Sequence, residues 1–360
     1  MLIAFSSSLI KFENRIQKAF VAIFMFLIML FFAAMRGTGE GDYFNYLHFA
    51  QVIKYWYQVT NPHFPVEIGF RFIAFVINSL DLSRQWVIAI MNILSIVPVI
   101  YITGKKSYNP IVSALVFLPF LLQFDMQTSR TATAMGMGLM AFYFNSQRKF
   151  FKTILFTILA ISFHKSALII IPMLFIAYIE FSRIFKIISI MFAFVISLRA
   201  RMFIDLFIKI IQSVGLSSVA AKIQRYTYGE DFAFAMKIID PRILFALFLF
   251  ITSLMYFENK DFKKASLEDV SIKAMWISLG LLLVFRQSTA VSFRLSSFYG
   301  LLEIIYIPLV IEKIKRFDPL GSFFIKASIG VYIIPYAIFL AMKAPAYDFF
   351  FSNPQAFILL

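Results

Sequence analysis

Long apolar stretches follow one another along this chain, and only short turns rich in basic residues separate them. Hydrophobic residues make up 61% of the 360 positions and charged residues only 15%, which is too little polar surface for a water-soluble fold. The sequence therefore predicts an all-α polytopic membrane protein with a single membrane domain over residues 1–360. The stretches long enough to span a bilayer, or nearly so, are 18–35, 86–103, 110–125, 131–145, 151–163, 166–181, 184–198, 242–257, 271–285, 295–311 and 322–342.

The basic turns set the expected orientation of these stretches. By the positive-inside rule the turns are cytoplasmic, which puts the N-terminus inside and the C-terminus outside. The spans then alternate between the two sides of the membrane, except for residues 66–80, which must enter and leave on the same side. This stretch has about fifteen residues, which as a helix reach roughly 22 Å, whereas the hydrocarbon core is about 30 Å thick. We expect about eleven transmembrane helices plus one re-entrant or broken helix at 66–80. Alternatively, residues 44–58 and 66–80 form a short pair that dips into the membrane.

Two segments on the expected outer side are long, residues 36–85 and residues 199–241. The second segment contains a stretch near 202–214 whose apolar residues recur at helical spacing. Such a pattern is typical of an amphipathic helix that lies on the membrane surface. Its apolar residues are Phe203, Leu206, Phe207, Ile210 and Ile211.

Arginine and lysine are distributed differently between the two sides of this topology. The cytoplasmic side has fourteen lysines and four arginines, whereas the outer side has six lysines and ten arginines. Lysine is the ordinary topological charge, while arginine is costly near lipid and binds phosphate in a planar fork. The arginine excess therefore predicts a site for an anionic, lipid-linked ligand on the outer side. The outer arginines are Arg36, Arg71, Arg84, Arg130, Arg199, Arg201, Arg225, Arg242, Arg286 and Arg294.

Composition argues against several other kinds of site. The chain has no cysteine and only three histidines, none in a His-x-x-x-His spacing, so we expect no disulfide and no metal site. The net charge of +15 is not gathered in a basic soluble domain, so we expect no nucleic-acid binding. No nucleotide-sugar motif is present, and we expect no cofactor.

Arg130 and His164 lie at similar expected depths in neighbouring helices. Arg130 is eighteen residues before Arg148 in a cytoplasmic turn, and His164 is sixteen residues after it. At 1.5 Å per residue both side chains are roughly 24–27 Å above that turn. This predicts a guanidinium and an imidazole at the floor of a cavity open to the outside. The alternative is that each residue caps a helix end at the headgroups.

The outer segment 36–85 contains further candidate residues. Between Arg36 and Asp42 three alternating glycines permit tight turns and expose N–H groups to an anion, unless this is only a flexible exit loop. Asp42 is suited to accept a proton or to hold a sugar hydroxyl. Glu67 and Arg71 lie one helical turn apart, a spacing that also fits a simple ion pair. The aromatic residues of the segment fit an interfacial belt at least as well as a sugar-stacking platform, and they are Tyr43, Tyr46, Tyr55, Trp56 and Tyr57.

A third group of candidates lies later in the chain. Arg225 and Tyr226 belong to the long outer segment, and Arg286 and Arg294 stand at the two ends of a short outer turn rich in hydroxyl groups. Two arginines beside hydroxyls suit a phosphate or pyrophosphate. The alternative is that these arginines extend to lipid headgroups.

Several of these residues form motifs that resemble the EpsG-type and Wzy-class polymerases of exopolysaccharide and O-antigen. The resemblance runs from about residue 33 to residue 300, with its elements in the right order. Its most specific element is Phe-His-Lys-Ser-Ala-Leu, which contains His164. The other elements are the glycine-rich entry with Asp-Tyr-x-x-Tyr (36–46), Glu-x-Gly-Phe (67–70), an arginine that opens a small-residue helix (130–134) and Arg-x-x-x-Phe-Tyr (294–299).

The resemblance implies a membrane glycosyltransferase whose fold is similar to the C-type class. Such an enzyme joins oligosaccharide units carried on undecaprenyl pyrophosphate, at the periplasmic face of the bacterial inner membrane. It works beside a chain-length regulator and a flippase. These partners and this location are what the resemblance implies.

For such a reaction the residues suggest distinct roles. His164 is the favoured general base because imidazole titrates near neutral pH, and Asp42 and Glu67 are its rivals. Arginines would neutralise the departing pyrophosphate, the largest electrostatic effect available. The predicted pyrophosphate-binding residues are Arg36, Arg130, Arg225, Tyr226, Arg286 and Arg294.

Two other functions use similar residues. A flippase or transporter of lipid-linked sugars also needs arginines in a cavity, but these should be reachable from both faces. An O-antigen ligase differs only in its acceptor, which is the lipid A core. The sugars, their linkage and the oligomeric state are not readable from the chain.

Overall fold

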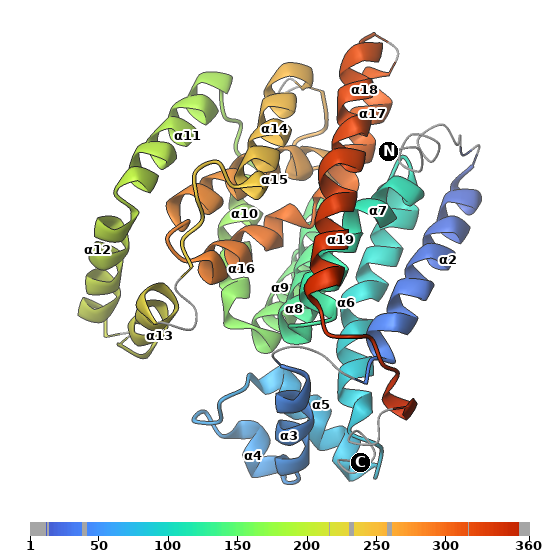
Figure 1. The fold of residues 1–360 in the computed structure, drawn as a ribbon, viewed down its shortest axis with the longest axis vertical. Helices are drawn as coiled ribbons and strands as arrows, with labels where there is room; N and C mark the ends of the chain where they lie inside the picture. Colours follow the sequence, from blue (N-terminus) through green and yellow to red (C-terminus); the bar gives the residue numbers. More distant parts are fainter. Residues whose placement is uncertain are drawn as a thin grey trace. The chain divides into compact units, whose positions relative to one another are not determined.

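The computed structural model describes residues 12, 14–37, 42–215, 217–229, 234–257, 261–315 and 317–352 (Figure 1). Apart from an isolated β-bridge between Arg36 and Phe349, the regular secondary structure of these residues is helical. Contacts divide the chain into two compact units: unit 1 is Met1–Ile171 with Glu303–Leu360, and unit 2 is Pro172–Leu302. The single membrane domain expected from the sequence stays a prediction.

Unit 1 is built on four long helices, in which α2 packs on α6, α6 on α8, and α8 on α9. Small residues allow this close packing. A Cβ atom on Gly136 of α8 would lie 2.6 Å from the carbonyl oxygen of Ser95 in α6, so only glycine fits there. Backbones that approach so closely are typical of helix interfaces in membranes. The helices are α2 (Arg15–Ala34), α6 (Gln85–Lys106), α8 (Ser129–Ser146) and α9 (Phe150–Phe163).

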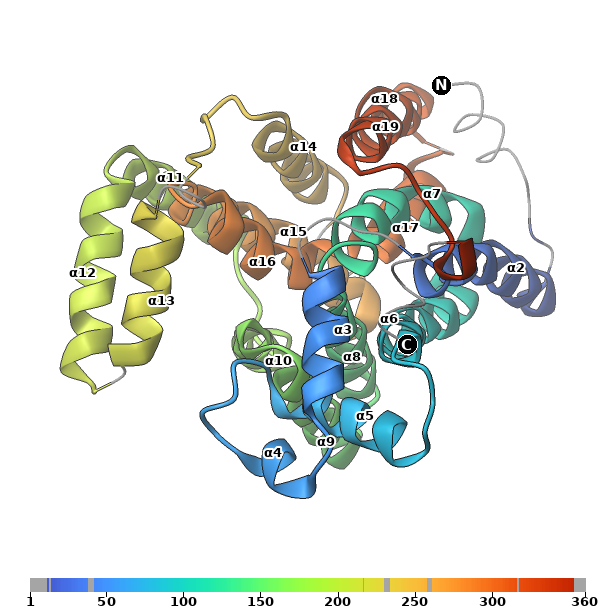
Figure 2. The same ribbon diagram turned by 60° about the horizontal axis from the view of Figure 1, so that its bottom comes forward.

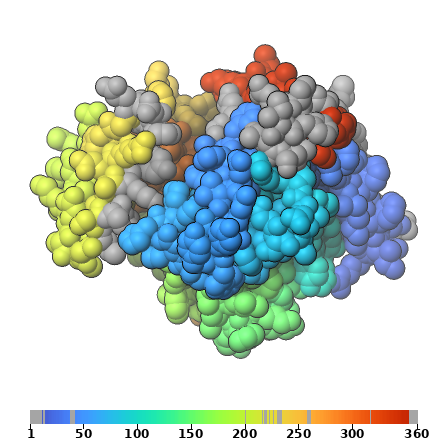
Figure 3. Space-filling view, turned by 90° about the horizontal axis from the view of Figure 1, so that it is seen from below, coloured from blue at the N-terminus to red at the C-terminus, as the bar shows by residue number. Residues whose placement is uncertain are grey.

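Residues 42–80 form three short helices that lie together on one face of unit 1 (Figure 2). The last of them, α5, packs on the other two and also on α6 and α9. Asn78 of α5 donates to the main-chain oxygens of Ala50 and Ile53, both at 2.6 Å, and so holds the end of α3. In the space-filling view this segment forms one continuous blue patch (Figure 3). The three helices are α3 (Tyr43–Val52), α4 (Trp56–Thr60) and α5 (Ile68–Ser79).

The C-terminal helices α17 and α19 of unit 1 pack on α7 (Pro110–Phe120). α7 begins at Asn109, whose side chain accepts two main-chain N–H groups, and it continues into a π-helical turn, η1 (Leu121–Asp125). Ser113 of α7 donates to the carbonyl oxygen of Ile304 at 2.6 Å and so joins α7 to α17. The other elements are η2 (Lys165–Ile169), α17 (Glu303–Ile314), α18 (Pro319–Ser328), η3 (Ile329–Ile333), α19 (Ile334–Lys343) and η4 (Phe350–Ser352).

The segment after α19, residues 347–350, returns to the end of α2. Gly37 donates its N–H to the carbonyl oxygen of Asp348 at 2.7 Å, and Phe350 donates to that of Met35 at 3.0 Å. A Cβ atom on Gly37 would lie 2.5 Å from Cα of Phe350, so this crossing requires glycine. The C-terminal segment therefore fixes the main chain on both sides of residue 36.

Unit 2 has its core where α11, α14 and α16 pack on α15. A separate pair, α12 and α13, lies side by side (Figure 2), with Ile204 and Ile208 of α12 packed on Ala220 of α13. The boundary between the units falls within α10 (Ile170–Ile176). The helices of unit 2 are α11 (Arg183–Leu198), α12 (Ala200–Ser213), α13 (Ser217–Tyr228), α14 (Pro241–Tyr256), α15 (Leu267–Val284) and α16 (Thr289–Gly300).

Each apolar stretch predicted from the sequence falls largely on one, two or three consecutive helical elements, although residues 177–181 at the end of the stretch 166–181 are not helical. Among the described residues, three helices are long and apolar enough to cross a membrane: Arg15–Ala34, Gln85–Lys106 and Pro319–Lys343. The number rises to five if each bent helix pair is one span. The protein is thus an all-helical membrane protein, while the count of about eleven spans stays a prediction.

Helices lie where two local predictions expected them, at residues 66–80 and near residues 202–214. α5 has 12 residues, which reach about 18 Å and are too few to span a bilayer, as expected for residues 66–80. The amphipathic helix expected near 202–214 is α12, which follows α11 after a bend of 94°. Leu206 and Ile210 on one side of α12 are each 51% exposed. How α5 and α12 lie in the membrane stays a prediction.

Candidate functional site

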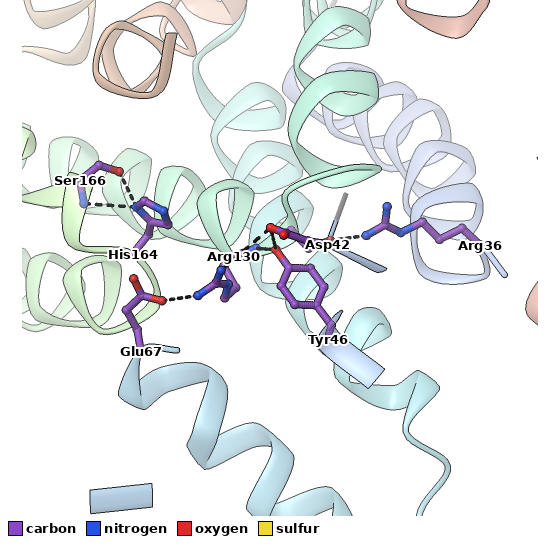
Figure 4. A network of polar contacts seen from close by, with 8 residues as sticks. Arg36, Asp42, Tyr46, Glu67, Arg130, His164 and Ser166 are labelled. Carbon is purple, nitrogen blue, oxygen red and sulfur yellow. Dashed lines mark hydrogen bonds and ion pairs between the residues drawn. The ribbon is translucent and has the colours of Figure 1, made fainter. Parts of the chain in front are cut away.

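Arg130, in the first turn of α8, is the centre of a polar cluster in unit 1 (Figure 4). Its Nη1 donates to Oε2 of Glu67 at 2.6 Å, and its Nη2 lies 4.0 Å from Oδ2 of Asp42. The Arg130 side chain is 17% exposed, that of Glu67 14% and that of Asp42 30%. Three candidates chosen from distant parts of the sequence therefore meet in one ion-paired group.

Tyr46 joins the two ends of this group. Its hydroxyl donates to Oδ2 of Asp42 at 2.9 Å and accepts the main-chain N–H of Arg130 at 3.4 Å. The Arg130 guanidinium lies 5.5 Å from the centre of the Tyr46 ring, within cation–π range. Burial raises the pKa of Tyr46 to about 12, against the lowering effect of Arg130, so the hydroxyl stays protonated. Tyr46 therefore holds Asp42 beside Arg130.

The Glu-x-Gly-Phe motif explains how Glu67 reaches this cluster. A Cβ atom on Gly69 would lie 2.8 Å from Oγ of Ser162, so glycine lets α5 approach the end of α9 closely. Phe70 is fully buried, and its ring packs 5.5 Å from that of Tyr46. The motif therefore places its glutamate between α8 and the end of α9.

Arg71 has a different partner from the one that its spacing suggested. Its Nη1 donates to the main-chain oxygens of Gln58, at 3.3 Å, and of Asn61, in the loop between α4 and α5. Glu67, one turn away, pairs instead with Arg130. Arg71 therefore holds the loop before α5, and the simple ion pair between Glu67 and Arg71 is not formed.

His164 lies directly after α9, and Figure 4 shows it with Glu67 on the same side of Arg130. Its Nδ1 accepts the main-chain N–H of Ser166 at 3.2 Å and lies 2.6 Å from Oγ of that residue. A ring nitrogen that accepts an N–H carries no proton. The neutral imidazole therefore has its proton on Nε2, which makes that nitrogen a donor.

Arg36 lies next to the cluster but is enclosed by the protein. Its side chain is 1% exposed, and Nη2 donates to Oγ of Ser129 at 2.8 Å. Burial lowers the pKa of Arg36 to about 10, with Tyr46, Tyr43, Asp125 and Asp42 acting in the opposite direction, so the group is charged at neutral pH. In this conformation Arg36 is not accessible to a large ligand. The predicted glycine-rich loop that follows it, residues 38–41, lies outside the described residues.

The aromatic residues of the outer segment fall into two groups. Tyr43 and Tyr46 are fully buried, and Tyr43 donates to Oε1 of Gln85 at 2.9 Å. Tyr55 and Tyr57 are 60% and 66% exposed and stack with their ring centres 5.9 Å apart. Only this second group is available to a sugar or to lipid headgroups.

The candidates of unit 2 form a separate set. Arg286 donates from Nε to the carbonyl oxygen of Ser197 at 2.9 Å and from Nη1 to that of Met236 at 3.0 Å, while its main-chain oxygen accepts from Met236. Arg225 is exposed in the last turn of α13, and Arg294 is half-buried in α16. Tyr226 also lies in α13, but its side chain is outside the described part of the structure. Pyrophosphate binding by these residues stays a prediction.

The sequence reasoning missed two parts of the site, Asp125 and the C-terminal segment 347–350. Asp125 ends the apolar stretch 110–125, is 1% exposed and is linked to Arg36 through Ser129. The sequence did contain a signal for Asp125, because a single carboxylate in an apolar stretch marks a functional site. The C-terminal segment gave no signal, because its contacts with residues 35–37 are made by main-chain atoms.

No group of three or more histidine, cysteine, aspartate or glutamate side chains in the described ranges is arranged to hold a metal ion. The chemistry available at the cluster is that of arginine, carboxylate, phenol and imidazole groups.

The fold and the cluster define an all-helical membrane protein with a site of paired arginine and carboxylate groups. The EpsG family matches residues 19–352, and the chain belongs to this family. Membership indicates a role like that of a polysaccharide polymerase, with glycosyltransferase-like chemistry. No curated protein and no solved structure matches the chain.

Proposed function

We propose that the protein polymerises oligosaccharide units carried on undecaprenyl pyrophosphate, at the periplasmic face of the bacterial inner membrane. The observation that carries this proposal is the meeting of three separate motifs around Arg130, which brings Asp42, Tyr46 and Glu67 to one side chain. Family membership points to the same class of reaction. About eleven membrane spans and a fold similar to the C-type glycosyltransferases belong to this proposal.

In the proposed reaction a hydroxyl oxygen of the acceptor sugar forms a bond to the anomeric carbon of the donor. The bond between that carbon and the pyrophosphate oxygen breaks, and undecaprenyl pyrophosphate leaves with the bonding electron pair. Arg130 stabilises the charge that develops on the leaving group. Pyrophosphate binding by Arg225, Arg286 and Arg294 stays the prediction made from the sequence. Arg36 does not contact the leaving group in this proposal, because its side chain is buried. It acts on Arg130 through its hydrogen bond to the preceding residue, Ser129.

The acceptor proton goes to Asp42. This carboxylate is the most exposed of the acidic groups in the cluster, and only its Oδ2 is engaged by described residues, with Tyr46 and Arg130. Glu67 is less suited because its ion pair with Arg130 is short. His164, which the sequence favoured as the base, presents Nε2–H and acts in this proposal as a donor to the pyrophosphate or to a sugar oxygen. The role of His164 as the general base stays a prediction, which the same variants test.

The experiment compares surface glycan in a deletion strain complemented with wild type, Asp42→Asn, His164→Ala or Asp205→Asn. Asp205 is a matched control because it also accepts a tyrosine hydroxyl, that of Tyr228, at 2.6 Å, but belongs to unit 2. Protein abundance is measured for each variant. A polymerase gives single repeat units in the deletion strain and a ladder of long chains with wild type and Asp205→Asn.

The outcomes separate the proposed function from its alternatives. Loss of the ladder in Asp42→Asn at normal abundance supports the base, and a normal ladder in that variant removes Asp42 from the role. Absence of any exported unit in the deletion strain contradicts polymerisation and indicates a flippase. Long chains that are not attached to the core indicate a ligase. A chain-length regulator and a flippase are the expected partners.

A further inference from the structure

The side chain of Arg36 is a buried cation with an incomplete set of hydrogen bonds. Nη2 donates to Ser129, but Nε and Nη1 are buried and have no hydrogen-bond partner among the described residues. The ring of Tyr43 covers one side of the guanidinium, with its centre 5.6 Å away. An enclosed charge is costly unless a counter-charge and hydrogen bonds compensate it. Arg36 therefore needs partners beyond Ser129.

Asp125 has a buried acceptor atom without a hydrogen-bond partner, just as Arg36 has buried donors without one. Its side chain is 1% exposed, and Oδ1 is buried without a hydrogen-bond partner among the described residues. It ends a π-helical turn, a feature that is frequent at functional sites. The carboxylate lies close enough to Arg36 for the two charges to act on each other. Asp125 is thus a buried carboxyl group beside the enclosed cation, and no direct ion pair joins the two side chains among the described residues.

Ser129 ties the two residues into one arrangement. Its hydroxyl accepts from Nη2 of Arg36 at 2.8 Å and donates to the main-chain oxygen of Asp125 at 2.9 Å. The buried N–H groups of Arg36 and the buried Oδ1 of Asp125 therefore belong to two residues that Ser129 links, and these atoms have no hydrogen-bond partner in the described part of the chain.

We propose that Arg36 and Asp125 enclose a binding site for one water molecule, and that Asp125 acts through this water and Arg36 as a positioning residue for Arg130. A water molecule is the smallest group that both accepts from a guanidinium and donates to a carboxylate. Burial of both side chains to 1% exposure leaves no path for a sugar or a phosphate. Arg130 directly follows Ser129, so the position of Arg36 is transmitted to the start of α8.

The charge couple is tested by a double-mutant cycle on the full-length protein in detergent, with Asp125→Asn, Arg36→Gln and the double variant. Removal of one partner leaves the other charge buried, so each single variant is expected to lower the thermal midpoint by about 5–10 °C. The double variant is expected to lose less than either single variant. A midpoint loss in the double variant equal to the sum of the single losses overturns the couple.

The pair formed by Asp240 and Arg242 is the matched control cycle. These side chains form a direct ion pair at 2.7 Å but are 16% and 23% exposed, so their cycle is expected to be nearly additive with small losses. The water itself is sought in a density map that resolves ordered water. A peak between Nη1 of Arg36 and Oδ1 of Asp125 is expected, and direct contact of these atoms without a peak overturns the water site.

The positioning role rests on the proposed function, and kinetics separate it from a merely structural role. Asp125→Asn, measured as correctly folded protein with a lipid-pyrophosphate-linked oligosaccharide, is expected to lower kcat about tenfold while the donor KM stays within about twofold. A raised donor KM with unchanged kcat contradicts positioning. If wild type makes no polymer, the proposed function fails, while the midpoints and the density map still decide on the couple and the water.

Discussion

Arg130 and Arg36 of unit 1 and Arg286 of unit 2 are held in different ways. In unit 1, Arg130 is paired with Glu67 and Asp42, and Arg36 lies enclosed near Asp125. In unit 2, the Arg286 side chain donates to two carbonyl oxygens, which are neutral. A pair with a carboxylate cancels charge and fixes geometry, whereas a carbonyl partner fixes geometry and leaves the charge.

This difference suggests a division of labour. The unit 1 cluster is suited to orient groups and to move a proton, because its charges are already largely balanced. The Arg286 side chain keeps its positive charge and is suited to attract pyrophosphate. The following variants test that division, from the largest expected effect to the smallest.

Replacement of Arg130 by lysine should be the most damaging change. Lysine keeps the charge but cannot bridge Glu67 and the Asp42–Tyr46 pair as a planar fork does, so we expect polymerisation to slow by about 10³-fold. Arg201→Lys, at an exposed position of α12, is the matched control and should leave the rate unchanged. Full activity of Arg130→Lys would mean that charge alone matters there. The rate is measured on membranes with equal amounts of each variant.

Gly69→Ala should displace Glu67 without touching it. The new Cβ would meet Ser162 at 2.8 Å from Oγ and 2.9 Å from the carbonyl oxygen, so α5 must move away from α9. A shift of about 1 Å is expected to lower kcat by about 10²-fold. Gly280→Ala in α15 is the control, since its nearest neighbour is the flexible end of Ile190 at 3.8 Å. Equal activity of the two variants would show that the close approach does not position the site.

Arg286→Gln tests the role of charge in unit 2. If Arg286 attracts pyrophosphate, the donor KM should rise about tenfold, with a smaller effect on kcat. The rise should shrink at high salt, because screening weakens the lost attraction. Arg242→Gln is the control, since the charge of Arg242 is already paired with Asp240. An unchanged donor KM together with a lower thermal midpoint would show that Arg286 stabilises the fold through its contacts with Ser197 and Met236 and does not attract the donor.

Tyr46→Phe should have the smallest effect of the four. It removes one hydroxyl that donates to Asp42 and accepts from Arg130, but it leaves the ring packed on Phe70. The loss of about 1 kcal/mol corresponds to a roughly fivefold lower rate. A comparison with Tyr43→Phe, which breaks the bond to Gln85 away from Arg130, shows whether the effect belongs to the cluster. Equal losses would contradict a specific role of Tyr46.

Much of the helical architecture could be predicted from the sequence, because long apolar stretches favour helices in a membrane and basic turns favour its cytoplasmic side. The predicted stretches fall largely on helices, and helices also lie within residues 66–80 and near 202–214. Individual lengths were less predictable. The stretch 295–311, for instance, falls on two helices, one ending at Gly300 and the next beginning at Glu303.

Most members of the candidate site were predictable from the sequence, but Asp125, the segment 347–350 and the contacts within the site were not. Asp42, Glu67, Arg130 and His164 were all identified, yet the spacing of Glu67 and Arg71 suggested a pair that is not formed. Spacing along one helix cannot show that a residue of another helix competes for the same carboxylate. The tautomer of His164 also depended on a neighbouring main-chain N–H, that of Ser166, whose direction only the backbone geometry reveals.

The sequence by itself determined that this is a helical membrane protein, and it predicted an anionic ligand for the arginines, because both inferences follow from the cost of placing each residue type in lipid or water. Only the tertiary structure decided which charges are cancelled and which are kept. The field at Arg130, Arg36 and Arg286 depends on groups from distant parts of the chain, and distances of a few ångströms set its strength.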